Sequence, residues 1–291
     1  MRLIQTILCL FITSFSYSQT NIVESSKHGL KNGVVSAKTY NYYPDSQKLN
    51  RITHATYKNG NITSLEEDYI HLDMKHLYTF SYLKDEKELL IDYKHFYKGT
   101  KNIDSTTLYQ RVDFHGFHFY YPKYNLKQAS YQLSNNLEIT YTLDEQEYFT
   151  QLIFNKDSTI TEQNQFEDFK RQTFNQKGWV TSKKYSNTYR TDYYYNDQGQ
   201  LITDSFHDKL MNRNRIPAIN TNYYYEYDSR GNWVKQVIIT PQPYKKKDVL
   251  WVRFVSRQLV YKDGLLSGKV DYDEKFVEKT MLKHRSKKRK I

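Results

Sequence analysis

The residues best suited to metal chemistry form an Asp-x-His-x-x-His pattern at Asp113, His115 and His118. Imidazole and carboxylate groups are common zinc ligands. The segment is predicted to be a strand, in which side chains two positions apart share a face. Asp113 and His115 would then share one face and His118 the other, unless Gly116 forms a bulge. We therefore predict no metal site here and interpret these residues as exposed strand positions.

Acidic residues could supply the two carboxylates with which glycosidases cleave a sugar chain. They cluster at Glu66-Glu67-Asp68, at Glu167-Asp168, and at Asp271 and Asp273. The sequence gives no basis for pairing them across a cleft. It also contains no phosphate-binding glycine loop, no nucleophile elbow and no His-Glu-x-x-His pattern. We therefore predict no catalytic residue and no cofactor, and keep an enzyme acting on polysaccharide as an alternative.

Tyrosine is the most distinctive component, with 29 of the 291 residues. Tyr223, Tyr225 and Tyr227 alternate along one predicted strand, so their rings share a face. Such rings either pack against cross-strand neighbours and keep their hydroxyls in water, or stack on sugar rings or another ligand. We favour packing. If the rings do bind a ligand, the candidates are Tyr193, Tyr195, Tyr223, Tyr225, Trp179 and Trp233, with Trp251 as a further platform.

The elements that would position these side chains are hairpins. Aromatic or β-branched residues alternate with polar ones, and turn residues recur between the runs. A longer turn, with glycine four positions after the last aromatic residue of a strand, follows Phe174, Tyr195 and Tyr227. Two-residue type I′ turns are predicted at Asn32-Gly33, Asn59-Gly60 and Asp263-Gly264. The turn glycines are Gly60, Gly178, Gly199, Gly231 and Gly264.

These patterns predict a mostly β protein, built as an antiparallel hairpin meander in an extended, curved or layered sheet. A short C-terminal helix is expected, because Phe276, Val277, Thr280 and Met281 fall on one face at helical spacing. The segments 205–220 and 240–248 contain prolines and are predicted to be irregular.

Residues 1–18 are predicted to form a signal peptide. Arg2 precedes an apolar stretch from Leu3 to Phe15, and the small Ser16 and Ser18 follow. The single cysteine, Cys9, lies inside this stretch, so the mature chain would have no disulfide and no thiol ligand or nucleophile. We therefore expect an exported protein in the periplasm, on the cell surface or outside the cell. Residues 19–275 would form one β-rich domain and 276–291 a basic helix or tail.

Residues 225–233, with the sequence Tyr-Glu-Tyr-Asp-Ser-Arg-Gly-Asn-Trp, resemble the YD-repeat motif of Rhs-type proteins. Residues 194–201 form a weaker copy, with Asn in place of Asp. The resemblance extends over roughly residues 190–265 and includes small exported bacterial proteins of unassigned function. It implies a strand-turn-strand module and no particular chemistry. Encapsulation is not implied, because there are few copies and no passenger domain.

The formal net charge of +11 is unevenly distributed. Residues 279–291 hold seven Lys and Arg residues and no acid, and Arg2 belongs to the predicted signal peptide, so the body carries only +3. A cationic end of this kind is usually solvated. Electrostatic attachment to an anionic surface through Lys287, Lys288, Arg289 and Lys290 is the alternative.

Together these features favour a non-enzymatic binding or structural module of the cell envelope, whose partner is a glycan or another envelope protein. An extracytoplasmic enzyme acting on polysaccharide is the second hypothesis. A binder of anionic surfaces or nucleic acid, acting through the basic tail, is the third, and nucleic acid is the less favoured of these two ligands.

Overall fold

The computed structural model describes residues 30–31, 33–83, 88–97, 109–115, 117–122, 126–133, 135–143, 146–164, 171–185, 188–209, 218–242 and 249–288. The predicted signal peptide, residues 1–18, and Cys9 within it lie outside the described residues. So do Asn32, Gly116, the Glu167-Asp168 pair, Arg289 and Lys290.

The described chain is almost entirely antiparallel β structure, as the alternating pattern predicts, followed by one helix of 15 residues. The strands of the first half are β1 (Val34–Tyr42), β2 (Leu49–Lys58), β3 (Asn61–Tyr69), β4 (Met74–Leu83), β5 (Glu88–Tyr97), β6 (Tyr109–Phe114), β7 (Phe117–Pro122), β8 (Leu126–Leu133), β9 (Asn136–Leu143) and β10 (Gln146–Phe154). The second half contains β11 (Ile160–Asn164), β12 (Arg171–Phe174), β13 (Val180–Lys184), β14 (Tyr189–Tyr195), β15 (Leu201–Asp208), β16 (Ile219–Tyr227), β17 (Trp233–Pro241), β18 (Leu250–Tyr261), β19 (Leu266–Ser267) and the helix α3 (Glu274–Lys288).

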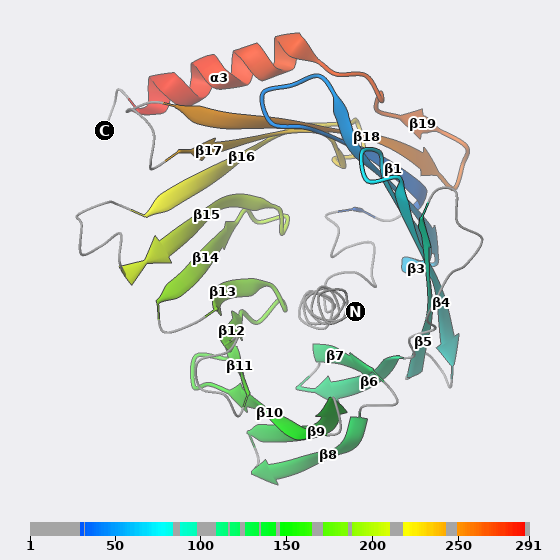
Figure 1. The fold of residues 1–291 in the computed structure, drawn as a ribbon, viewed down its shortest axis with the longest axis vertical. Coiled ribbons are helices and arrows are strands. Elements are labelled where there is room, and N and C mark those ends of the chain that lie inside the picture. Colours follow the sequence, from blue (N-terminus) through cyan, green and yellow to red (C-terminus); the bar gives the residue numbers. More distant parts are fainter. Residues whose placement is uncertain are drawn as a thin grey trace.

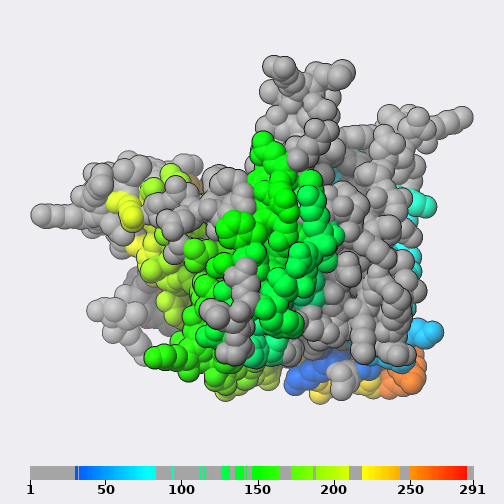
Figure 2. All heavy atoms as spheres, turned by 90° about the horizontal axis from the view of Figure 1, so that it is seen from below, coloured from blue at the N-terminus to red at the C-terminus, as the bar shows by residue number. Residues whose placement is uncertain are grey.

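One large open sheet is formed by two meanders that meet at a single seam. The strand pairs give the order β5-β4-β3-β2-β1 for the first meander and β18-β17-β16-β15-β14-β13-β12-β11-β10-β9-β8 for the second. The seam is the antiparallel pair of β1 and β18, in which Val34 faces Tyr261. The short β19 adds beside the end of β18. Figure 1 shows the sheet curling through most of a circle, and in Figure 2 the first strands lie beside the last ones at one edge.

The two faces of the sheet are distinguished by the helix. Val237 and Phe254 are register partners and cluster with Phe276 of α3. The next pair, Ile238 and Arg253, must point to the opposite face, because side chains alternate along a strand. In Figure 1, α3 lies on the outside of the curve. We call the face under α3 convex and the other face concave.

Two further apolar clusters are buried, one across the seam and one in the second meander. One joins β1 through β4 to β17 and β18 and includes Val34, Ala55, Ile62, Leu65 and Leu259. The other joins the separate hairpin β6–β7 to β9 through β13 and includes Phe114, Phe119, Leu137, Ile139 and Leu152. Each fully buried side chain of this size contributes about 1.5–3 kcal/mol, so these clusters are the main source of stability.

A five-residue turn recurs at one rim of the sheet. In each copy the amide of the first residue donates to the carbonyl of the fifth, and the amide of the fourth donates back to the carbonyl of the first. The copies begin at Asn155, Asn175, Asn196, Asp228 and Tyr261. They join β10 to β11, β12 to β13, β14 to β15, β16 to β17 and β18 to β19. Because the strands are antiparallel, these alternate connections all lie at the same rim, which we call the turn rim.

Side-chain oxygens of the first turn residue stabilise three of these turns. Oδ1 of Asn175, Asn196 and Asp228 each accepts hydrogen bonds from the backbone amides of the third and fifth residues, at 2.9–3.0 Å. Asn and Asp suit this position because their short side chains can accept from the backbone two residues on. All five predicted turn glycines have positive φ, between 75° and 84°.

Two expectations about local structure need correction, at Asp263-Gly264 and over residues 205–220. Asp263-Gly264 is not a type I′ pair, because only Gly264 has positive φ, and it belongs to the five-residue turn that begins at Tyr261. Asn59-Gly60 is a two-residue hairpin turn as predicted, with φ of 53° and 84°. The segment 205–220 is less irregular than expected, because β15 continues to Asp208 and β16 begins at Ile219.

The placement of His115 on a strand is also wrong. His115 has a φ of 47° and lies in the hairpin turn between β6 and β7, where its ring stacks on Phe154 at 4.5 Å. Asp113 and His118 are register partners in that hairpin. The sequence favoured alternation through this segment and missed the turn, because a histidine in the left-handed region is uncommon.

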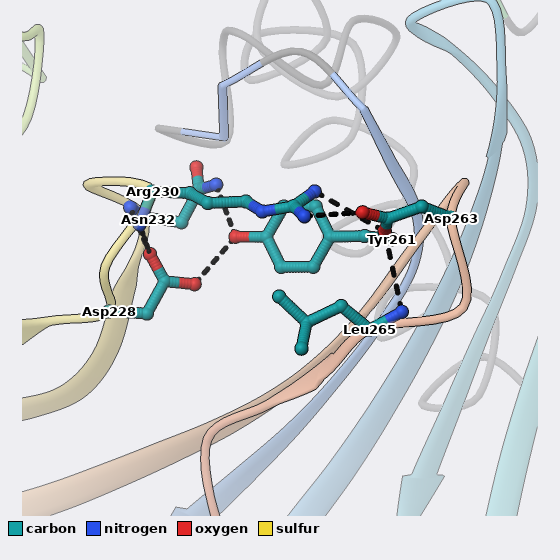
Figure 3. A network of polar contacts seen from close by, with 6 residues as sticks. All are labelled: Asp228, Arg230, Asn232, Tyr261, Asp263 and Leu265. Carbon is teal, nitrogen blue, oxygen red and sulfur yellow. Dashed lines mark hydrogen bonds and ion pairs between the residues drawn. The ribbon is translucent and has the colours of Figure 1, made fainter.

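The five-residue turns are connected to one another along the rim (Figure 3). The Tyr261 hydroxyl donates to Asp228 Oδ2 and accepts from Asn232 Nδ2 at 2.7 Å, which ties the last turn to the one before it. An ion pair between Arg230 and Asp263 spans the same two turns. The Lys31 amide donates to Asn232 Oδ1, so the start of the first meander joins this contact. We call Asp228, Asn232 and Tyr261 the rim clasp.

Earlier turns are connected in the same way. In three turns the fifth residue contacts the tyrosine that lies just before, or begins, the next turn. Gln200 Oε1 accepts from the Tyr227 hydroxyl at 2.6 Å. The Trp179 ring lies 5.4 Å from that of Tyr195. The repeated tyrosines therefore act between neighbouring hairpins.

The helix is anchored to the convex face as its sequence pattern predicts. Phe276, Val277 and Met281 pack against the sheet, and the buried Thr280 lies beside them. Asp273 accepts from the Phe276 amide at 2.9 Å and caps the helix. The helix begins at Glu274, two residues before the predicted boundary. No helix in the described ranges has the length and apolar character needed to cross a membrane.

Replacement of two turn glycines by alanine should have unequal effects on stability. A Cβ at Gly199 would lie 2.6 Å from Trp179 Cζ2, whereas one at Gly264 meets no atom within 4 Å, although the φ angles are 80° and 82°. Gly264→Ala should cost about 1–2 kcal/mol through its backbone conformation alone. Gly199→Ala should cost about 1–3 kcal/mol more, because the indole must move. Urea unfolding of both variants measures the difference, and equal losses would contradict the packing of Trp179 beneath this turn.

Candidate functional site

The concave face carries the tyrosines that the sequence proposed as ligand contacts. Tyr223 is a register partner of Ile238 and Tyr225 of Gln236, on the face opposite α3. On the neighbouring hairpin of β14 and β15, Tyr193 pairs with Asp204. Tyr195 lies two residues after Tyr193 on the same strand. The structure therefore brings these four rings to one face.

Their hydroxyl groups form hydrogen bonds within the protein. Tyr195 donates to the carbonyl of Val180 at 2.8 Å, and Tyr225 to the carbonyl of Leu201 at 2.6 Å. Burial raises the pKa of Tyr195 to about 12 and also raises that of Tyr225. These two phenols stabilise neighbouring hairpins, which is the packing explanation that the sequence favoured.

Tyr223 and Tyr193 interact with side chains instead. The Tyr223 hydroxyl donates to Asp204 Oδ2, and the Tyr193 hydroxyl lies 3.3 Å from that of Tyr185. Burial raises the pKa of both phenols, and the partner groups raise them further. Burial also raises the pKa of Asp204, against the opposing effects of Tyr223, Thr221 and Arg253. The carboxyl group of Asp204 is thus partly withdrawn from water on the concave face.

Two of the three tryptophans proposed as ligand contacts, Trp233 and Trp179, pack against other residues of the sheet. Trp233 is only 7% exposed, and the Arg257 guanidinium lies 3.4 Å from the centre of its ring. Burial lowers the pKa of Arg257 to about 10. Trp179 lies between Tyr195, Lys177 and the turn at Gly199. A ligand role for either ring stays a prediction, and neither offers an open face like that of Trp251.

Trp251 is the exposed tryptophan, with 52% of its surface accessible. It pairs with Thr240 of β17, two positions from the Ile238–Arg253 pair, so its ring lies on the concave face. Arg253 follows two residues later on the same face and is also exposed.

Trp251 ends a row of side chains that crosses five strands. Tyr193 pairs with Asp204, Asp204 pairs with Thr221, and Thr240 pairs with Trp251. A hydrogen bond of 3.3 Å from the Thr240 hydroxyl to the Thr221 hydroxyl connects the remaining two neighbours of this row. Four strand spacings correspond to about 19 Å. We call Tyr193, Asp204, Thr221, Thr240 and Trp251 the concave row.

Sequence reasoning named the two ends of this row and missed its middle. Tyr193 and Trp251 belong to aromatic patterns, whereas Asp204, Thr221 and Thr240 are ordinary strand residues in the sequence. Their alignment depends on the register of four strand pairs and has no local signal. Arg253 was missed for the same reason.

The described acidic clusters are largely used in ion pairs and helix capping. Glu67 receives a hydrogen bond from Arg51 at 3.1 Å and lies 3.8 Å from His76 Nδ1. Glu66 pairs with Lys75 at 2.7 Å. Asp273 caps α3 and pairs with Lys235 at 2.7 Å. Among the residues that the structure describes, no group of three histidine, cysteine or acidic residues is arranged to hold a metal ion.

The convex face of β13, β14 and β15 holds a serine, an aspartate and a histidine in contact. Ser182 donates to Asp192 Oδ1 at 2.9 Å, and His207 Nε2 lies 3.1 Å from Asp192 Oδ2. The aspartate lies between the other two residues. A nucleophilic triad requires the imidazole between serine and carboxylate, so this arrangement does not activate Ser182.

No protein-family model matches the chain. No curated protein matches it either.

The tyrosines of the concave face and turn rim should make the fold sensitive to alkali. Burial raises the pKa of Tyr57, Tyr195 and Tyr261 to about 12, whereas unfolded tyrosine ionises near 10. A pKa raised by folding supplies stability that is complete below the unfolded value and is lost as the pH rises through the folded value. Unfolding free energy should therefore fall between about pH 10 and 12.

Phenolate ultraviolet absorbance and circular dichroism, followed together, test this expectation. A large fraction of the tyrosines should ionise only as the strand signal disappears. If nearly all phenolates form around pH 10 while the strand signal persists, the tyrosines are not buried as described.

Proposed function

We propose that the protein is an exported, non-enzymatic binding module of the cell envelope whose concave row binds a polysaccharide. The observation that carries this proposal is the exposed Trp251 at the end of the row, with Arg253 exposed beside it. Exposed tryptophan and arginine are the residue types that most often dominate binding surfaces.

The chemistry of the row suits a chain of sugar rings. A pyranose has a face of C–H groups, which an indole can cover, and a rim of hydroxyls. Trp251 supplies the apolar ring, and Asp204, Thr221 and Thr240 supply acceptors and donors for hydroxyl groups. The row extends over about 19 Å, which favours an extended polymer over a single small molecule.

The export expected from residues 1–18 is part of the proposal, as is a location in the periplasm, on the surface or outside the cell. We also propose that the chain is related to YD-repeat proteins. The rim clasp supports this relation, because Asp228, Gly231 and Asn232 of the motif each have a defined contact or conformation there.

The test is affinity electrophoresis of the chain from Gln19 onward in gels containing polygalacturonate, a uronic acid polymer, or dextran, a neutral one. Retardation by either polymer is expected. Trp251→Ala should lower the affinity roughly ten-fold or more. Tyr194→Ala is the matched control, because Tyr194 is equally exposed, at 51%, but its register partner Thr203 places it on the convex face.

Retardation that Trp251→Ala and Tyr194→Ala weaken equally would contradict the concave row as the site. No retardation by any polymer would favour an envelope protein as the partner. Release of new reducing ends from a retained polymer would support the second hypothesis, an enzyme with an unassigned carboxylate pair.

A further inference from the structure

Helix α3 is fixed to the sheet along one side. Tyr224 and His284 are joined by a hydrogen bond of 2.8 Å between the hydroxyl and Nδ1, and His284 is buried. Lys235 bridges Asp273 at the start of the helix and Glu226 of β16, at 2.7 and 2.6 Å. The orientation of the helix is therefore set, and so is the set of residues that it turns away from the protein.

The outward side of α3 combines cations with an exposed leucine. Lys279, Lys283 and Arg285 are exposed, and Leu282 lies among them with 68% of its surface accessible. The helix has two acids, Glu274 in its first turn and the exposed Glu278, which lies one turn before Leu282, and residues 279–288 contain none. We call Lys279, Leu282, Lys283 and Arg285 the basic face of α3.

Two ordinary explanations account for part of this pattern. Cations near the C-terminus of a helix stabilise its dipole, which applies to the last turn but not to Lys279. A solvated surface helix often carries lysine. Neither explanation accounts for a leucine left open between cations on a helix that already buries Phe276, Val277 and Met281.

We propose that the basic face of α3 binds the surface of an anionic phospholipid membrane. Each Lys or Arg near such a surface contributes favourable electrostatic energy, and clusters on one helix add together. Leu282 would enter the boundary between headgroups and acyl chains, where apolar side chains are stabilised. A nucleic acid backbone offers phosphates but no comparable apolar layer, so the exposed leucine favours lipid.

This site is independent of the proposed polysaccharide site. The helix covers the convex face of β16 to β18, and the concave row lies on the opposite face of the same strands. A protein attached through α3 would hold its concave row away from the membrane.

The experiment is co-sedimentation of the chain from Gln19 onward with vesicles of equimolar phosphatidylglycerol and phosphatidylethanolamine. Lys279→Gln/Lys283→Gln/Arg285→Gln should lower partitioning roughly 100-fold. Lys58→Gln/Lys156→Gln/Lys262→Gln is the matched control, because it removes the same charge from exposed residues in or next to turns elsewhere. The control should bind nearly as well as the wild type, and phosphatidylcholine vesicles should bind none of the three proteins.

Leu282→Asn separates lipid from other anions. It should weaken vesicle binding several-fold and leave any binding to duplex DNA unchanged, because only the bilayer offers an apolar layer. Circular dichroism should show every variant folded, since all the substituted side chains are exposed. Equal loss in the two triple variants, or binding to DNA without binding to vesicles, would overturn the proposal.

Discussion

The Asp228 carboxylate accepts hydrogen bonds from two amides of its own turn and from the Tyr261 hydroxyl of the next turn, and the sheet depends on this contact. It lies at the seam where β1 joins β18, the only strand pairing between the two meanders among the described residues. Burial raises the pKa of Asp228, but the bonds from Tyr261 and Asn232 outweigh it and hold the pKa below its usual value. Asn232, which is fully buried, extends the contact to Lys31.

Contacts of the same kind explain why the sheet can hold so many tyrosines. A ring covers the neighbouring strand, and its hydroxyl reaches a carbonyl or side chain of the previous hairpin, as for Tyr195, Tyr225 and Tyr227. Burying a phenol without such a partner would be costly. The hydroxyls of those tyrosines are used within the sheet, whereas Trp251 and Arg253 are exposed on the concave face.

The sequence predicted what depends on local pattern. Alternation identified the hairpin meander, positive φ was assigned to glycines such as Gly199 and Gly231, and helical spacing identified the buried side of α3. It did not identify what depends on register. Asp204, Thr221 and Thr240 come together only because their strands are aligned, and Trp233 is buried by Arg257, which lies 24 residues later. His115 was misplaced because alternation does not reveal its left-handed backbone conformation in the hairpin turn.

A double-mutant cycle on the rim clasp tests the central claim most directly. Urea unfolding of Asp228→Ala, Tyr261→Phe and the double variant would give the energy with which the two side chains stabilise each other. Neighbours in one hydrogen-bond network should couple by about 1–3 kcal/mol, and stability should be lost cooperatively across both meanders. Additive effects, with a coupling energy near zero, would contradict the clasp as the contact that ties the last two turns together beside the seam.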